Sequence, residues 1–166
     1  CMLSGVDEKT ALDGMIKAEP DPGATIIWEL NFSGTHNYFV NLLAANDPAS
    51  TYSVFKQLEP RIGNTLLCIF LNTRDDRRYR THQMLDLVFN KIKPAMLIVR
   101  GEKLPAQFDK YQKENPAIKT LQLPYKSGIM EISQTFATLE GYYIVGIGNM
   151  VGWGEQFMQD LKKYRA

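Results

Sequence analysis

Four arginines and two aspartates are crowded into the segment Asn72-Thr73-Arg74-Asp75-Asp76-Arg77-Arg78-Tyr79-Arg80. A guanidinium group can donate two parallel hydrogen bonds to a carboxylate or a phosphate, and a neighbouring aspartate can hold it in place. We therefore expect Arg74, Arg77 and Arg80 to bind such an anion, with Asp76 as their organiser. The alternative is a solvated turn whose charges form weak internal ion pairs.

A second polar segment combines three glycines with an asparagine, in the pattern Gly146-x-Gly148-Asn149-x-x-Gly152. Glycines between a strand and a helix let backbone amides approach an anion where the helix begins. A dinucleotide-binding motif would open a βαβ unit, whereas this pattern follows the last predicted strand, which argues against a nicotinamide site. A purely structural turn and a loop that contacts the substrate remain the two interpretations.

Other residues suited to chemistry are sparse. Asn41 lies inside an apolar stretch, where a buried amide needs a partner from a neighbouring loop or from a ligand. His36 and His82 are far apart and have no cysteine or carboxylate cluster at ligand spacing, so we expect no metal site. The pattern G-x-x-x-x-G-K-[ST] is absent from the sequence, so the standard phosphate loop of nucleotide triphosphatases is not available here.

The elements that must position these residues follow from hydrophobic periodicity. Apolar runs predict strands, and apolar residues at helical spacing predict helices between them. Strands without in-out alternation are covered on both faces, and their alternation with helices predicts a three-layer, Rossmann-like α/β sandwich with a mostly parallel sheet. The predicted strands are 25–30, 38–45, 66–71, 95–99, 118–123 and 142–147, and the predicted helices are 3–19, one from Pro48, 81–92, 106–113, 127–139 and 154–165.

Three details of this prediction are specific. The polar stretch 31–37 should form a loop that joins the first two strands in an antiparallel pair, and Thr81 should cap the third helix. Cys68 should be a buried, inert thiol. In open α/β sheets ligands bind beyond the carboxyl ends of the strands, so the arginine segment and the glycine segment should meet at one edge.

Length and composition limit the class of protein. The 166 residues suit one ordinary domain, and a net charge of +1 argues against a general nucleic-acid binder. No apolar stretch approaches the ~20 residues that a membrane helix needs, so we expect a soluble domain. The segment Glu19-Pro20-Asp21-Pro22-Gly23 predicts a hinge, with residues 1–24 as the end of a preceding domain and 25–166 as the domain itself.

Several segments, in this order, resemble those of a known family. They are Phe39-Val40-Asn41, Ala44-Ala45-Asn46-Asp47, Asn72-x-Arg74-x-Asp76-Arg77-x-x-Arg80-Thr81, Tyr125-Lys126-Ser127 and Gly146-x-Gly148-Asn149-x-x-Gly152. Over residues 11–164 the chain resembles the ligase subunit of poly-γ-glutamate synthases (the CapB/PgsB type). That family is similar in turn to Mur ligases and folylpolyglutamate synthases, whose Rossmann-like C-terminal domain follows a proline-glycine hinge.

The resemblance implies a C-terminal substrate-binding domain of an ATP-dependent amide ligase, which joins glutamate to a growing chain through an acyl phosphate. ATP and Mg²⁺ would be bound mainly by a central ATPase domain outside this chain, so the chain alone should be inactive. It also implies roles for particular residues. Asn41, Asn46 and Asp47 would face the nucleotide, and Gly146, Gly148 and Asn149 would face the amino acid.

The resemblance further implies partners and a location. The partners would be glutamate or its polymer, the central ATPase domain and the membrane subunits of a synthase complex, at the cytoplasmic face of the membrane, with no nucleic acid. Two alternatives remain at this point: a stand-alone module for a small anion or nucleotide, and an NADP-dependent oxidoreductase.

Overall fold

The computed structural model describes residues 4–18, 21, 23–45, 47–101 and 104–166. Six strands form one sheet in the order β1-β2-β6-β3-β4-β5, and β1 is antiparallel to β2 while the other pairs are parallel. This confirms the predicted mostly parallel sheet with an antiparallel start. The strands are β1 (Ile27–Phe32), β2 (Thr35–Leu42), β3 (Leu66–Asn72), β4 (Met96–Arg100), β5 (Lys119–Leu123) and β6 (Tyr142–Gly148).

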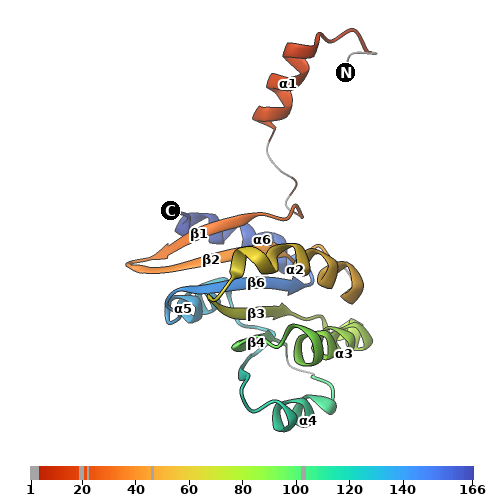
Figure 1. The fold of residues 1–166 in the computed structure, drawn as a ribbon, viewed down its shortest axis with the longest axis vertical. Coiled ribbons are helices and arrows are strands. Elements are labelled where there is room, and N and C mark those ends of the chain that lie inside the picture. The colour runs from red at the N-terminus through yellow and green to blue at the C-terminus, as the bar shows by residue number, and fades with distance from the viewer. Residues whose placement is uncertain (1–3, 19–20, 22, 46, 102–103) are drawn as a thin grey trace.

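Helices cover both faces of the sheet, which gives the three predicted layers (Figure 1). On one face the sheet side chains pack against α2 (Pro48–Ile62), α3 (Arg78–Leu87) and α4 (Gln107–Glu114). On the other face they pack against α5 (Ile129–Ala137) and α6 (Trp153–Leu161). The strands contribute buried side chains to both clusters because they are sandwiched, which is why their sequences lack polar alternation.

The path of the chain makes the carboxyl end of β6 a switch point. Its neighbours β2 and β3 are followed by α2 and α3 on one face, whereas β6 is followed by α6 on the opposite face. Loops that leave neighbouring strands towards opposite faces open a crevice between them. The arginine segment follows β3 and the glycine segment ends β6, so the fold brings these two segments together.

The connection between β1 and β2 is tighter than predicted. Instead of a seven-residue loop, a hairpin turns at Ser33 and Gly34, and the two strands pair up to Phe32 and Thr35. Both turn residues have positive φ, 55° and 109°, which is the geometry that matches the twist of a two-residue hairpin. Asn31 supports the turn by accepting a hydrogen bond from the Gly34 amide.

The third helix begins earlier than predicted. A 3₁₀ turn, η2 (Asp75–Arg77), leads directly into α3 at Arg78, so Thr81 lies inside the helix and does not cap it. A π-helical turn, η3 (Val88–Ile92), continues α3, and Lys93 at φ 51° ends it. Cys68 is fully buried, as predicted, and burial raises the pKa of its thiol.

The helix predicted for residues 3–19 is α1 (Glu8–Lys17), capped by Asp7, and residues 3 and 19 lie outside the described part. This helix buries none of its residues and stands apart from the sandwich (Figure 1). After the sandwich helix α6 the chain makes a 3₁₀ turn, η4 (Lys162–Tyr164), and Arg165 bridges to Leu30 of β1. Within the described residues, no helix is both long and apolar enough to span a membrane.

Candidate substrate-binding edge

Three residues form one row at the carboxyl ends of the central strands. Arg100 of β4 is the register partner of Asn72 of β3, and Asn72 is the partner of Gly148 of β6. Gly148 has φ +107°, and a Cβ at this position would lie 2.3 Å from the carbonyl oxygen of Asn72. Only glycine permits this close approach of the two strand ends, so Gly148 has a definite steric role at the edge.

The loops after β3 and β6 are tied to each other by hydrogen bonds. The backbone amide of Asn149 donates to the carbonyl oxygen of Asn72 at 2.9 Å, and the side-chain amide of Asn72 donates to the carbonyl oxygen of Asn149 at 2.7 Å. Asn72 is 1% exposed and Asn149 is half-buried, so the contact is partly shielded from water. The relative position of the arginine and glycine segments is therefore determined by a part-buried, reciprocal contact.

Arg74 and Asp76 form a bidentate ion pair on the same edge. Arg74 donates from Nε to Oδ1 of Asp76 at 2.9 Å and from Nη2 to Oδ2 at 2.7 Å. The hydrogen bonds and charge of Arg74 lower the pKa of Asp76, and those of Asp76 raise the pKa of Arg74. Asp76 therefore orients one of the three arginines, in the way that its predicted organising role requires.

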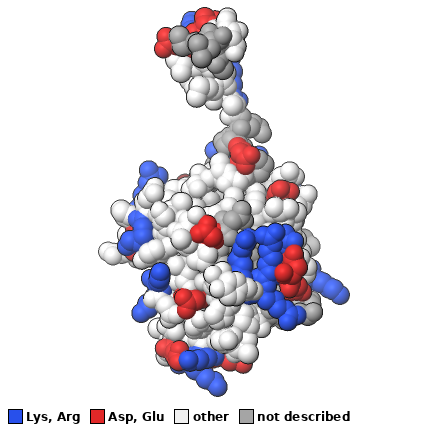
Figure 2. All heavy atoms as spheres, turned by 90° about the vertical axis from the view of Figure 1, so that its right-hand side faces the viewer, with Lys and Arg blue, Asp and Glu red and all other residues white. Residues whose placement is uncertain are grey.

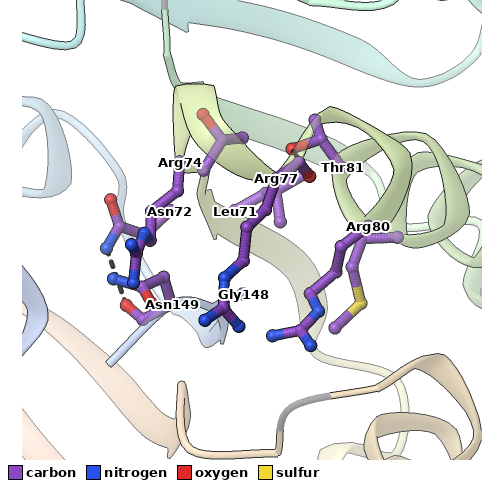
Figure 3. A pocket seen from close by; sticks show the side chains of 10 residues that line it. Leu71, Asn72, Arg74, Arg77, Arg80, Thr81, Gly148 and Asn149 are labelled. Atoms are coloured by element: carbon purple, nitrogen blue, oxygen red, sulfur yellow. Dashed lines mark hydrogen bonds between the residues drawn. The ribbon is translucent and has the colours of Figure 1, made fainter. Parts of the chain in front are cut away.

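Arg77 and Arg80 project from η2 and α3 towards the same open side (Figure 3). Together with Asn72, Arg74, Gly148 and Asn149 they line a narrow pocket, here called the arginine pocket, of about 20 Å³. Among the described residues neither Arg77 nor Arg80 forms an ion pair. The pocket can thus offer two guanidinium groups to an anion, and Arg77 and Gly148 lie on one rim as predicted.

Charge is concentrated on this edge of the molecule. The arrowheads of β3 and β6 point to the side that faces the viewer in Figure 2, where basic side chains gather with acidic ones at their border. A concentration of positive charge next to backbone amides raises the local concentration of anionic ligands. This local cluster coexists with a net charge of only +1 because acidic residues lie elsewhere on the surface.

A wider hollow adjoins the arginine pocket. It is lined by Asn72, Arg74, Arg100, Tyr125, Asn149 and Trp153, among others, and encloses about 360 Å³, a volume within the ~300–1,000 Å³ typical of small-molecule sites. We call it the aromatic depression. Arg100 was not among the predicted site residues because a single charge at the end of an apolar strand is a weak signal. Its surroundings come from β3, from the loop after β5 and from α6, which only the fold brings together.

The predicted nucleotide-facing residues are distributed differently. Asn46 lies outside the described residues. Asp47 is exposed and is the N-cap of α2, where it accepts a hydrogen bond from the Ser50 amide at 2.9 Å. Hydrogen bonds from Ser50 lower the pKa of Asp47, and the positive charge of Arg80 adds to this effect.

Asn41 and Gly146 are buried register partners in the sheet, one residue before the end of β2 and two residues before the end of β6. The side chain of Asn41 donates to the carbonyl oxygen of Ala24 and accepts from the amide of Leu43, so it tethers the hinge to β2. A Cβ at Gly146 would lie 2.8 Å from Cζ of Phe39, so this glycine makes room for an aromatic ring. Neither residue lines the arginine pocket or the aromatic depression.

The described residues contain no group of three histidine, cysteine, aspartate or glutamate side chains that could hold a metal ion. The side chains that line the two hollows carry mainly guanidinium groups, amides and aromatic rings, and the one carboxylate among them, Asp76, is paired with Arg74. Such groups bind carboxylates and phosphates through charge-assisted hydrogen bonds. They do not fit a Mg²⁺ ion, which prefers carboxylate and other oxygen ligands.

Two curated proteins are similar in sequence to the chain. It is 36% identical to the PGA synthase CapB of Bacillus subtilis (strain 168), with 98% of this chain and 42% of that protein covered. It is 32% identical to the capsule biosynthesis protein CapB of Bacillus anthracis, with 91% of this chain and 33% of that protein covered. The chain thus spans less than half the length of these two curated relatives.

Comparison of folds leads to the Mur ligases. The structure of MurF from Acinetobacter baumannii matches with a TM-score of 0.55 at 15% identity, covering 98% of this chain and 35% of that one. At this identity the match supports the fold alone. The family model described as the poly-gamma-glutamate synthase CapB C-terminal domain matches residues 27–164. The chain therefore belongs to the family of CapB C-terminal domains.

Proposed function

We propose that this chain is the C-terminal substrate-binding domain of an ATP-dependent amide ligase that joins glutamate to a growing poly-γ-glutamate chain. The observation that carries the proposal is the convergence of Arg74, Arg77, Arg80 and Asn149 at the switch point between β3 and β6. In a member of the CapB family, an anion-binding edge is what an acidic amino acid and an acidic polymer require.

In this proposal the residues of the edge have different roles in binding the anionic groups of the substrate. Arg77 and Arg80 bind a carboxylate or phosphate directly, while Arg74 is held by Asp76 at the border between the two hollows. Gly148 and Asn149 shape the side that faces the amino acid. Positioning of this kind lowers the barrier because the reacting groups are held close together and correctly aligned.

The nucleotide would lie on the side of Asp47, next to Arg80, with Asn46 as its neighbour in the chain. Asn41 would act on this side through the hinge, because it holds Ala24. ATP would supply the phosphoryl group that turns a carboxylate into an acyl phosphate, and the amine of glutamate would then displace phosphate to form the amide. Since the described residues do not fit Mg²⁺, we assign the metal to the central domain of a longer protein.

This assignment implies a division of the chain and a setting for it. Residues 1–24 would be the end of a central ATPase domain plus the hinge, and residues 25–166 the substrate-binding domain. The chain covers less than half of each curated relative, which supports a longer protein. In that protein the edge would close against the central domain and exclude water from the acyl phosphate. The membrane subunits of a polymer synthase would be further partners, at the cytoplasmic face of the membrane.

A deletion experiment tests the proposal. The longer protein should release ADP in a glutamate-dependent manner and extend γ-linked chains, and removal of residues 25–166 should abolish both activities. The 166-residue chain alone should show neither. Glutamate-dependent ADP release that survives the deletion would refute the role of this domain, and tight binding of NADP by the chain would favour an oxidoreductase instead.

A further inference from the structure

Arg100 is a buried cation at the carboxyl edge of the sheet. It is 4% exposed, and its guanidinium carbon lies 4.0 Å from the ring centre of Trp153 and 4.6 Å from that of Tyr125. Burial of a charged side chain is costly unless its hydrogen bonds are made and its charge is stabilised. Contacts with aromatic faces offset part of that cost, because the ring faces carry negative electrostatic potential.

The hydrogen bonds of Arg100 reach three acceptors in two segments, the end of β3 and the loop after β5. Nε donates to the carbonyl oxygen of Ser127 at 3.3 Å, Nη2 donates to the carbonyl oxygen of Tyr125, and Nη1 donates to Oδ1 of Asn72 at 3.0 Å. All three acceptors are neutral, and none of the described acidic side chains pairs with Arg100. Burial lowers the pKa of Arg100, which is consistent with a guanidinium held without a carboxylate.

The bond to Asn72 has a consequence for the side chain of that residue. A guanidinium group can only donate, so the amide of Asn72 must turn its oxygen towards Arg100 and its NH₂ group away. The NH₂ group then faces the carbonyl oxygen of Asn149 and donates to it at 2.7 Å. Arg100 thus selects one of the two orientations of the Asn72 amide, and this orientation holds the loop that carries Asn149.

We propose that Arg100 is a positioning residue of the substrate-binding edge, which acts through the amide of Asn72 on Asn149 and through Tyr125 and Ser127 on the wall of the aromatic depression. The inference rests on the proposed function, because it assumes that the acidic amino acid is bound at this edge. It adds a residue that stands on β4, outside the arginine and glycine segments. It also links the carboxyl ends of β4, β3 and β6, whose last residues are register partners.

This role can be tested by measuring KM for glutamate and KM for ATP in Arg100 variants of the longer protein. Arg100→Met keeps the length and loses every donor, and Arg100→Lys keeps the charge but cannot reach three acceptors. We expect either variant to raise KM for glutamate about tenfold or more, as loss of charge-assisted hydrogen bonds implies, while KM for ATP stays nearly unchanged. Arg61→Met, at the exposed end of α2, is the matched control and should leave both constants unchanged.

A further variant isolates the step through Asn72. Asn72→Asp keeps an acceptor for Arg100 but cannot donate to the carbonyl oxygen of Asn149, so it should raise KM for glutamate as the Arg100 variants do. If Arg100→Met fails to fold, Arg100→Lys and Asn72→Asp decide the question. A wild-type KM for glutamate in these folded variants would overturn the proposal, as would equal changes in the constants for glutamate and ATP.

A measurement on the 166-residue chain separates this inference from the proposed function. The side-chain NH₂ resonances of Asn72 should be resolved and exchange slowly with solvent in the wild type, and in Arg100→Lys they should exchange at least several-fold faster. Unchanged exchange would overturn the positioning role even if the ligase activity is established. Conversely, faster exchange together with a longer protein that does not use glutamate would refute the proposed function and leave the link between Arg100 and Asn72 in place.

Discussion

The side-chain amide of Asn72 donates to the carbonyl oxygen of Asn149 at 2.7 Å, and this bond joins the carboxyl ends of β3 and β6. The two residues are far apart in the sequence. Asn72 begins the arginine segment, and Asn149 belongs to the glycine segment. Because the contact is part-buried and is accompanied by a backbone hydrogen bond in the opposite direction, the two segments form one rigid edge. This edge is the structural basis of the proposed site.

The close approach at Gly148 predicts a large loss of stability in Gly148→Ala. The new methyl group would lie 2.3 Å from the carbonyl oxygen of Asn72, at a φ of +107° that side chains rarely adopt. Gly34→Ala is the matched control, because Gly34 has φ +109° with nothing within 4 Å of a Cβ. Positive φ alone should cost about 1–3 kcal/mol in the control, and Gly148→Ala should cost more.

Urea unfolding of both variants measures the difference. The excess loss in Gly148→Ala reports the steric contact with β3, separate from the backbone conformation. Equal free energies of unfolding for the two variants would mean that the strand ends can separate without cost, and would contradict a rigid edge.

The ion pair of Arg74 and Asp76 predicts a specific pH dependence. Because Arg74 lowers the pKa of Asp76 in the folded state, the pair contributes fully above the ordinary value of 3.8 and is lost as the pH falls through the lower, folded-state value. An NMR titration of the Asp76 carboxyl carbon should therefore give a midpoint below 3.8. In Arg74→Ala the midpoint should move back towards that value, and an unchanged midpoint would show that the pair does not persist in solution.

The role of Asn41 in tethering the hinge to β2 can be tested by substitution. Asn41→Ala leaves the buried amide of Leu43 without its side-chain acceptor, so we expect a loss of about 1–3 kcal/mol. The control is Asn37→Ala, which removes another buried amide, one that binds Phe136, Leu139 and Tyr142. Both variants should be destabilised and should keep the KM for ATP. A raised KM for ATP in Asn41→Ala alone would make Asn41 a nucleotide contact instead.

Much of this architecture could be predicted from the sequence because the strands are long apolar runs and the helices have clear periodicity. The meeting of Arg77 and Gly148 followed from the rule that carboxyl ends of parallel strands share an edge. The start of α3 was mispredicted because Asp75–Arg77 form a 3₁₀ turn, which leaves no periodic signal. The antiparallel pairing of β1 and β2 was predicted, but their tight two-residue turn was missed because Ser33 adopts a positive φ that serine seldom shows.

The site was harder to predict in detail. Arg100 could not be recognised because its partners come from β3, from the loop after β5 and from α6, and no spacing in the sequence relates them. The family resemblance assigned Asn41 to the nucleotide and Gly146 to the amino acid. In the structure Asn41 holds Ala24, and Gly146 makes room for the ring of Phe39. Residue type alone does not distinguish a ligand contact from a residue that makes a hydrogen bond or leaves space in the protein interior.

The central claim is that the arginine pocket binds the acidic groups of the substrate, and Arg77 tests it most directly. Arg77 is exposed and forms no ion pair with the described residues, so Arg77→Ala should leave the melting temperature nearly unchanged. In the longer protein kcat/KM for glutamate should fall about tenfold or more, while the control Arg61→Ala keeps the wild-type value. Wild-type kcat/KM in a folded Arg77→Ala variant would contradict the account.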